Sequence, residues 1–302
     1  MRNLRYFFLF SSLFFVVFST GCVPETYQYS SEFGKAGSAK GEFLGPTDML
    51  TTKSGDLLIA DSGNNRIQIV GIDGTPKLAI GEYGTTWFKF QGISGLGQNR
   101  LSGEIAVCDL RGSKIVKFDA NGTPLLRFTE RVKCPIDVDF DKIGNMYVIM
   151  AKQPYIFMYD VVGRFQKTIG GKGKAAFIFP SSILINDETI YVADFGSKRI
   201  VKMNMNGDVQ AEITQKGEFE PLKGPSGMFF DPSQNSFLLD LGEVPVVMLA
   251  PDGALISKIG SFGKEPGQFL YPKGIAAKDT GEVFVLDNSR NVVIVFKKAP
   301  GK

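Results

Sequence analysis

One short phrase recurs six times along this sequence: an apolar run, an acidic residue, a polar turn and a second apolar run. Methionine replaces the acid in the third copy, and the six marker positions are Asp61, Asp109, Met150, Asp194, Asp240 and Asp287. The steps between successive markers are 48, 41, 44, 46 and 47 residues. A period of about 45 residues that recurs in this way is typical of a propeller or a solenoid.

Each copy divides into short strands. In the last copy, residues 275–277, 282–286 and 291–296 form apolar runs, and residues 279–281 form a turn. A fourth run follows each complete copy, as at residues 76–84. Short β-branched and aromatic runs separated by turn residues indicate antiparallel all-β structure. Four strands in each of six copies predict a six-bladed β-propeller of four-stranded antiparallel blades.

The two ends of the repeat array are incomplete in complementary ways. The last copy stops after its third strand, at residues 292–296, and supplies no fourth. Residues 32–46 resemble residues 261–272, which are the end of a fourth strand and its connector. We therefore expect residues 25–33 to pair with the last blade and close the ring, because pairing would order a segment that otherwise frays.

A proline opens the innermost strand of most copies. It stands 14 or 15 residues before the marker and is found at Pro46, Pro135, Pro180, Pro225 and Pro272. In the second copy, alignment on Gly92 puts Phe90 in this slot and makes residues 96–102 a longer turn. The same alignment puts Trp87 where other copies have a phenylalanine, which predicts a packing role for the tryptophan.

These copies resemble NHL repeats. The segments "IYVADFGSKRIVKM" (residues 190–203) and "LLIADSGNNRIQIV" (residues 57–70) match the NHL pattern of a strand, an acid, a polar turn, an Arg-Ile pair and a second strand. The third copy departs from it at Met150 and Tyr155, and the fifth departs at Pro245. The resemblance covers the chain after residue 30 and implies a six-bladed propeller, but it specifies little about function.

The repeated acid has a structural interpretation. Basic residues follow it by five positions in three copies, as with Asp61 and Arg66. Such an acid can accept backbone N–H bonds in the turn and face the base across it. Repetition around the ring favours this architectural role over catalysis, because a catalytic group is needed only once.

The first residues have the pattern of a secretory signal. Arg2 and Arg5 precede the apolar residues 6–18, and a small-residue site ends at Cys22. This pattern resembles the bacterial lipoprotein signal, which implies lipidation of Cys22, export and a lipid anchor at the cell envelope. Ser19 stands where an aliphatic residue is usual, so cleavage without lipid and a retained anchor stay as alternatives. We assign residues 1–22 to the signal and residues 23–302 to one propeller domain.

Charge and cysteine content bound the partners. The net charge is +3, from 34 Lys and Arg against 31 Asp and Glu, and no basic block is present. This composition does not indicate nucleic acid binding. Cys108 and Cys134 are expected to be two separate buried thiols, with a disulfide left open because its geometry cannot be read from sequence.

The chain contains no histidine. This removes the commonest general base and metal ligand, together with Ser-His-Asp and Cys-His nucleophiles. Peptide-amidating lyases and virginiamycin-type lyases resemble this architecture but rely on histidines, so their chemistry does not carry over. A gluconolactonase-like hydrolase, which holds a divalent cation with carboxylates and an asparagine, stays as the alternative. Its candidates are Asp48, Asp137 and Asp139, with Asn186 nearby. No haem, phosphate-loop or Ca²⁺-loop motif is found, and we predict no cofactor.

Binding is the preferred hypothesis, because propellers present loops on a rigid scaffold. Six aromatic and charged residues of the connectors have no explanation in the repeat, and they are Phe88, Lys89, Lys172, Lys174, Phe219 and Glu220. Mixed aromatic and charged surfaces suit protein or peptide recognition. We therefore predict a monomeric, non-catalytic scaffold whose partner is a protein or peptide at the envelope.

Overall fold

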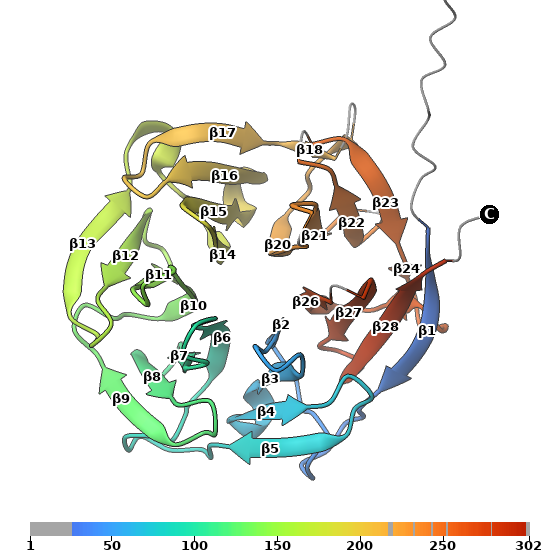
Figure 1. Cartoon of the computed structure of the whole chain (residues 1–302), viewed down its shortest axis with the longest axis horizontal. Coiled ribbons are helices and arrows are strands. Elements are labelled where there is room, and N and C mark those ends of the chain that lie inside the picture. The colour runs from blue at the N-terminus through green and yellow to red at the C-terminus, as the bar shows by residue number, and fades with distance from the viewer. Residues whose placement is uncertain are drawn as a thin grey trace, which may run out of the picture.

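Six four-stranded sheets are arranged radially in the computed structural model, as Figure 1 shows. The structure describes residues 26–216, 220–231, 233–242, 244–251, 253–278 and 280–299. All pairings within the six sheets are antiparallel. The predicted six-bladed all-β propeller is therefore confirmed.

The strands of each blade follow one another from the centre outward. Blade one has β2 (Asp48–Thr51), β3 (Leu57–Asp61), β4 (Arg66–Val70) and β5 (Pro76–Ile80). Blade two has β6 (Ile93–Gln98), β7 (Ile105–Asp109), β8 (Lys114–Phe118) and β9 (Pro124–Phe128). Blade three has β10 (Pro135–Phe140), β11 (Met146–Met150), β12 (Tyr155–Tyr159) and β13 (Phe165–Gly170).

The second half of the ring repeats this order. Blade four has β14 (Pro180–Asn186), β15 (Thr189–Asp194), β16 (Arg199–Asn204) and β17 (Val209–Ile213). Blade five has β20 (Pro225–Phe230), β21 (Ser236–Asp240), β22 (Val246–Leu249) and β23 (Leu255–Ile259). Blade six has β26 (Pro272–Ala277), β27 (Glu282–Asp287), β28 (Val292–Lys298) and β1 (Tyr27–Phe33).

Short elements complete the connectors and turns. The strand pairs are β18 (Gln215–Lys216) with β19 (Glu220–Pro221) and β24 (Ser261–Phe262) with β25 (Gln268–Phe269). The 3₁₀ turns are η1 (Ser62–Asn64), η2 (Gly173–Ala175) and η3 (Phe195–Ser197).

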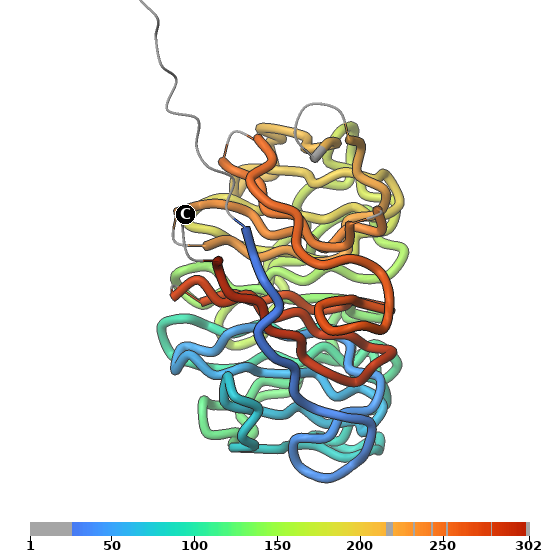
Figure 2. Tube along the Cα trace, turned by 90° about the vertical axis from the view of Figure 1, so that its right-hand side faces the viewer, coloured from blue at the N-terminus to red at the C-terminus, as the bar shows by residue number. Residues whose placement is uncertain are grey.

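The first strand closes the ring, as predicted. β1 pairs with β28 in a register that sets Tyr27 opposite Lys298 and Phe33 opposite Val293. In the side view of Figure 2, β1 is blue and lies against β28, which is red. Blade six is thus assembled from both ends of the described chain.

The hydrophobic core lies between neighbouring blades. Leu57 and Ile59 of β3 pack in a cluster with blade six, whereas Leu58 and Ala60 of the same strand pack in a cluster with blade two. Successive side chains of a strand point to opposite faces of the sheet, so a strand buried on both faces is apolar throughout. This explains the continuous apolar runs of the repeat.

The repeated aspartates have the expected structural role in the turn, and they also bind the connector that enters the blade. Arg66 Nε lies 2.7 Å from Asp61 Oδ2, so acid and base do meet across the turn. Each marker aspartate also accepts backbone N–H groups from the connector that enters its own blade; those from Leu44 and Gly224 lie at 2.7 Å and 2.6 Å. In blade three, the Met150 sulfur takes the acceptor position, 3.3 Å from Lys133 N. The markers therefore fasten each connector to the turn beside it.

The alignment predicted for blade two is wrong by three residues. Ile93 is opposite Asp109, as Pro272 is opposite Asp287, so Ile93 holds the proline slot. Phe90 is fully buried in the repeated phenylalanine position, whereas Trp87 is 58% exposed. Residues 96–98 belong to β6, not to a turn. With isoleucine in place of proline, Gly92 was the wrong anchor; Gly95 is the glycine that matches the other blades.

Candidate functional site

The inner strands surround a central channel that widens at both ends. A cavity of about 960 Å³, which we call the mouth, is lined by the starts of the inner strands and by the turns between second and third strands. A cavity of about 530 Å³ opens at the other end, beside the turns between first and second strands. The two share lining residues, including Asp48, Asp137 and Met228, so these residues lie at the waist of the channel.

Two carboxylates at the waist join neighbouring blades. Asp48 of β2 accepts the Leu96 N–H of blade two at 2.8 Å and the Met49 N–H at 2.7 Å. Asp137 of β10 accepts the Ile183 N–H of blade four at 3.0 Å. These side chains bridge the seams between blades one and two and between blades three and four.

Asp139 repeats this arrangement two residues further along β10. Its carboxylate accepts the Ile185 N–H at 2.7 Å and the Phe140 N–H at 2.9 Å. Burial raises the pKa of both Asp48 and Asp139 to about 6, and the donated N–H groups offset only part of this effect. The pKa of Asp137 is raised well above its usual range, first by burial and then by the Asp48 charge.

The structure does not assemble the predicted channel carboxylates into a metal centre. Within the described ranges, no group of three or more His, Cys, Asp or Glu side chains could hold a metal ion. Asn186, the suggested amide ligand, lines a separate hollow and donates a hydrogen bond to Gln234. Each of the three aspartates instead binds backbone N–H groups of its own strand and of the next blade.

A row of hydroxyl groups joins the inner strands just inside the mouth. Thr47 donates to the Ile93 carbonyl at 3.0 Å, Ser94 to the Pro135 carbonyl at 2.7 Å, and Ser181 to the Pro225 carbonyl at 2.8 Å. Each donor directly follows the proline slot of its blade and reaches the next blade. These bonds define a repeated seam position around the channel.

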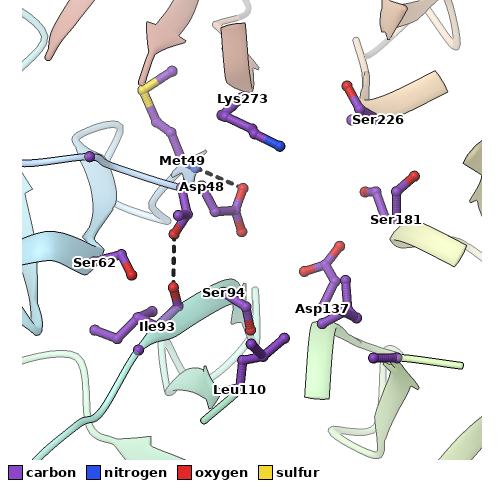
Figure 3. Close-up of a pocket in the computed structure, with 18 of the residues that line it drawn as sticks. Asp48, Met49, Ser62, Ile93, Ser94, Leu110, Asp137, Ser181, Ser226 and Lys273 are labelled. Carbon is purple, nitrogen blue, oxygen red and sulfur yellow. Dashed lines mark hydrogen bonds between the residues drawn. The ribbon is translucent and has the colours of Figure 1, made fainter. Parts of the chain in front are cut away.

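Lysine replaces the hydroxyl at the seam position of blade six. Figure 3 shows Lys273 and Asp137 directed toward the same open space. The Lys273 Nζ lies 4.5 Å from the Tyr271 ring centroid, a cation–π distance. Among the described residues, Lys273 forms no ion pair. This lysine has no counterpart in the seam, so the repeat does not explain it.

Exposed apolar side chains surround the mouth. They line its cavity from connectors and turns of four blades, and they are Tyr83, Phe179, Phe195, Leu241 and Tyr271. Arg111 and Lys152 lie among them, and no carboxylate of the described chain is within 4.0 Å of either cation. Apolar side chains gathered around a cavity on an otherwise soluble surface mark an interaction site.

The residues predicted for binding lie away from this mouth. Phe88 is half-buried and stacks near Phe118, and Lys89 forms an ion pair with Glu82 at 2.9 Å. None of the predicted binding residues that the structure describes lines the mouth cavity.

The other predicted positions lie on the outer connectors or outside the described residues. Lys172 is exposed, Lys174 pairs with Glu212 at 3.4 Å, and Glu220 pairs with Lys258 at 3.0 Å. Phe219 and Cys22 lie outside the described residues.

Sequence reasoning missed the mouth residues, although the repeat held a signal for them. Phe195 and Leu241 directly follow their marker aspartates, and Phe179 and Tyr271 directly precede their prolines. These positions hold Ser62 and Gly45 in blade one. Comparison of equivalent positions would have shown that apolar residues at turn positions gather at one end of the ring.

The remaining predictions about cysteines and membrane spans have plain outcomes. Cys108 and Cys134 are both free thiols, as predicted, but only Cys108 is buried. The prediction that Cys134 is buried is wrong, because it lies on an exposed connector. Burial raises the pKa of the Cys108 thiol. In the part of the chain that the structure describes, no helix is long and apolar enough to span a membrane.

Sequence comparison finds distant relatives only. No protein-family model matches the chain. It is 26% identical over 137 residues to Protein brain tumor of Drosophila melanogaster and 24% identical over 137 residues to the B-box type zinc finger protein ncl-1 of Caenorhabditis elegans. The matched segment is 45% of this chain but 13% and 16% of those proteins, so the chain spans a small part of their length.

Structure comparison finds propellers of low sequence identity. A streptogramin B lyase has a TM-score of 0.60 at 14% identity, with 90% of this chain and 98% of the lyase covered. A Bacteroides thetaiotaomicron protein of unknown function has a TM-score of 0.70 at 14% identity, with 90% and 76% covered. Kuenenia stuttgartiensis hydrazine synthase has a TM-score of 0.63 at 11% identity, with 87% and 98% covered. At such identities the likeness concerns the fold alone, and with the structure it indicates a six-bladed β-propeller.

Proposed function

We propose that this chain is an NHL-type propeller that acts as a non-catalytic scaffold, exported to the bacterial cell envelope and anchored there through a lipid on Cys22. Its partner is a protein or peptide, and the binding surface is the mouth. The observation that carries the proposal is the set of exposed apolar side chains around a cavity of about 960 Å³. Cavities of this size with mostly apolar walls are typical binding sites.

The mouth residues are exposed without a packing reason. Tyr83 is 70% exposed and Phe179 is 55% exposed, although other aromatic residues in the same connectors are buried. Aromatic residues held on short connectors of a rigid ring are costly to expose and effective in binding. We therefore move the proposed binding surface from the outer connectors to the mouth.

The channel gives less support to the alternative carboxylate-metal hydrolase. Asp48, Asp137 and Asp139 each accept two backbone N–H bonds and fix the seams of the ring. The lyase neighbours add no support for catalysis, because their identity of 14% carries only the fold and this chain has no histidine.

The position of β1 is compatible with an anchored scaffold. Its first residue, Tyr27, pairs with Lys298 at the end of the ring opposite the mouth. A membrane attachment upstream of Thr26 would therefore leave the mouth accessible to a partner.

Affinity capture from bacterial envelopes tests the binding function. The bait is the chain from residue 23, compared with Phe179→Ser plus Phe195→Ser at the mouth and with Ile143→Ser, a 69% exposed residue of the opposite face, as the matched control. We expect one reproducible partner that is lost only with the mouth variant. If the partner is lost with Lys172→Ala and kept with the mouth variant, the binding surface is on the outer connectors and not at the mouth.

Two further measurements test the rest of the proposal. Cys22→Ser should move the protein from the membrane fraction to the soluble fraction. A ligand that binds only the native state raises its stability. A non-catalytic scaffold without a metal site should therefore show no stabilisation in a thermal-shift scan with Ca²⁺, Mg²⁺, Mn²⁺ and Zn²⁺. A metal-dependent shift with an empty capture would favour the hydrolase.

A further inference from the structure

We propose that the mouth binds an acidic peptide segment, with an apolar side chain of the peptide inside the cavity and its carboxylates against Arg111, Lys152 and Lys273. This inference rests on the proposed binding function and specifies the chemistry of the partner. It follows from the charges of the mouth, the segregation of charge between the two faces, and the aliphatic walls of the cavity.

The three cations of the mouth lie on three different blades. Arg111 and Lys152 occupy the second position after the marker in blades two and three, and Lys273 occupies the seam position of blade six. No acidic side chain of the described chain forms an ion pair with any of them. The acids that line the cavity, Asp48 and Asp137, lie at its waist and are bound by backbone N–H groups. An anionic partner would therefore meet cations of the mouth that form no ion pair with the described residues.

Charge is segregated between the two faces of the ring. Connectors and turns on the mouth side carry lysines with no ion pair among the described residues, and these are Lys40, Lys133, Lys172, Lys198 and Lys264. Turns on the opposite side carry aspartates that accept backbone N–H groups of the turn, and these are Asp73, Asp119, Asp141, Asp160 and Asp231. Complementary charge steers encounter and orients a partner, so acidic partners are directed to the mouth.

The interior of the mouth favours a peptide over a nucleic acid. Besides the aromatic residues, the lining of the cavity includes the aliphatic residues Ile93, Leu110, Ile136 and Ile275. Such walls accept an apolar side chain, whereas a nucleotide base brings polar edges that need hydrogen-bond partners. The cations are also spread around a cavity and do not form a track along which successive phosphates could bind. An acidic peptide with one apolar anchor matches both features.

Selection from a random dodecapeptide library tests the inference without knowledge of the natural partner. The target is the chain from residue 23, which contains the whole described fold. We expect selected peptides to share an aromatic or aliphatic residue flanked by Asp and Glu. Selection of basic or uncharged peptides, or no enrichment at all, would overturn the inference.

Charge-reversal variants of the mouth provide a second test. Fluorescence anisotropy of a selected peptide should show binding weakened by about tenfold or more in Lys273→Glu and in Arg111→Glu, because each change replaces an attraction with a repulsion. Lys278→Glu is the matched control, since Lys278 is on the same blade but lines the opposite cavity. A version of the peptide with its acids replaced by lysine should bind Lys273→Glu better than it binds the unmodified protein. Equal weakening by Lys278→Glu would contradict the proposed site.

An oligouridylate of ten nucleotides is the competing probe. Tighter binding of this probe than of the selected peptide, with loss in Lys273→Glu, would replace the peptide by single-stranded nucleic acid. Envelope capture with the same variants separates this inference from the proposed function. If envelope capture depends on Phe179 and Phe195 but not on Lys273 or Arg111, the scaffold function stands and the acidic-peptide inference fails.

Discussion

Asp139 lines the channel and accepts backbone N–H groups from Phe140 and Ile185. Burial raises its pKa to about 6 from a usual 3.8. Between these two values the folded protein holds a proton that the unfolded chain has released. The stability that this proton provides is complete below about pH 4 and is lost as the pH rises through about 6. Asp139→Asn should therefore reduce the pH dependence of stability.

The two pKa values set the size of the effect. Between pH 4.5 and 7.5, the penalty for ionising Asp139 lowers the free energy of unfolding of the unmodified protein by about 2 kcal/mol. An asparagine does not ionise, so the variant does not have this penalty. Its altered hydrogen bonds to Phe140 and Ile185 change stability equally at both pH values, so that contribution cancels when the two pH values are compared.

Urea unfolding followed by circular dichroism gives the required free energies. The measured quantity is the stability difference between Asp139→Asn and the unmodified chain from residue 23, at pH 4.5 and at pH 7.5. It should move in favour of the variant at the higher pH by about 2 kcal/mol. Asp73→Asn is the control of opposite sign, because the Thr75 N–H lowers the pKa of this exposed carboxyl. Parallel pH profiles for Asp139→Asn and the unmodified protein would refute the reasoning.

Four substitutions test the fold, each by its effect on the free energy of unfolding in urea. Asp240→Ala should cost about 2–3 kcal/mol, because connector N–H groups lose a buried acceptor; a neutral effect would contradict the role of the markers. Gly274→Ala should cost about 2 kcal/mol, because its Cβ would lie 2.7 Å from Met49 N across the seam of blades six and one. Phe90→Ala should lower the free energy of unfolding by about 3–5 kcal/mol and Trp87→Ala by less than about 1 kcal/mol. A larger loss for Trp87→Ala than for Phe90→Ala would favour the alignment on Gly92 that the sequence suggested.

The architecture was predictable because the repeat fixes its own register. The markers recur once per blade, so strand count, blade count and closure by β1 follow from comparison of one copy with the next. Prediction failed where one copy lacked its proline. With Ile93 in that slot, Gly92 and Gly95 were both acceptable anchors. The pairing of Ile93 with Asp109 and the burial of Phe90 decide between them.

The site was less predictable, because its residues are separated by whole blades. Phe179 and Tyr271 become neighbours of one cavity only after the ring closes. Lys89 and Lys174, by contrast, appeared unexplained in sequence but form ion pairs with Glu82 and Glu212 on the outer part of the ring. A sequence without pairing information cannot separate a cation that is free to bind from one that is already neutralised.

Closure by the first strand also determines how the ring would respond to force. β1 runs antiparallel to β28 from Tyr27, at the end opposite the mouth, to Phe33 near the mouth. A pull on Thr26 would reach the ring through β1, so it would load the β1–β28 hydrogen bonds before any other pairing of the ring. The β1–β28 pairing is thus the junction through which a tether at Thr26 would hold the whole ring.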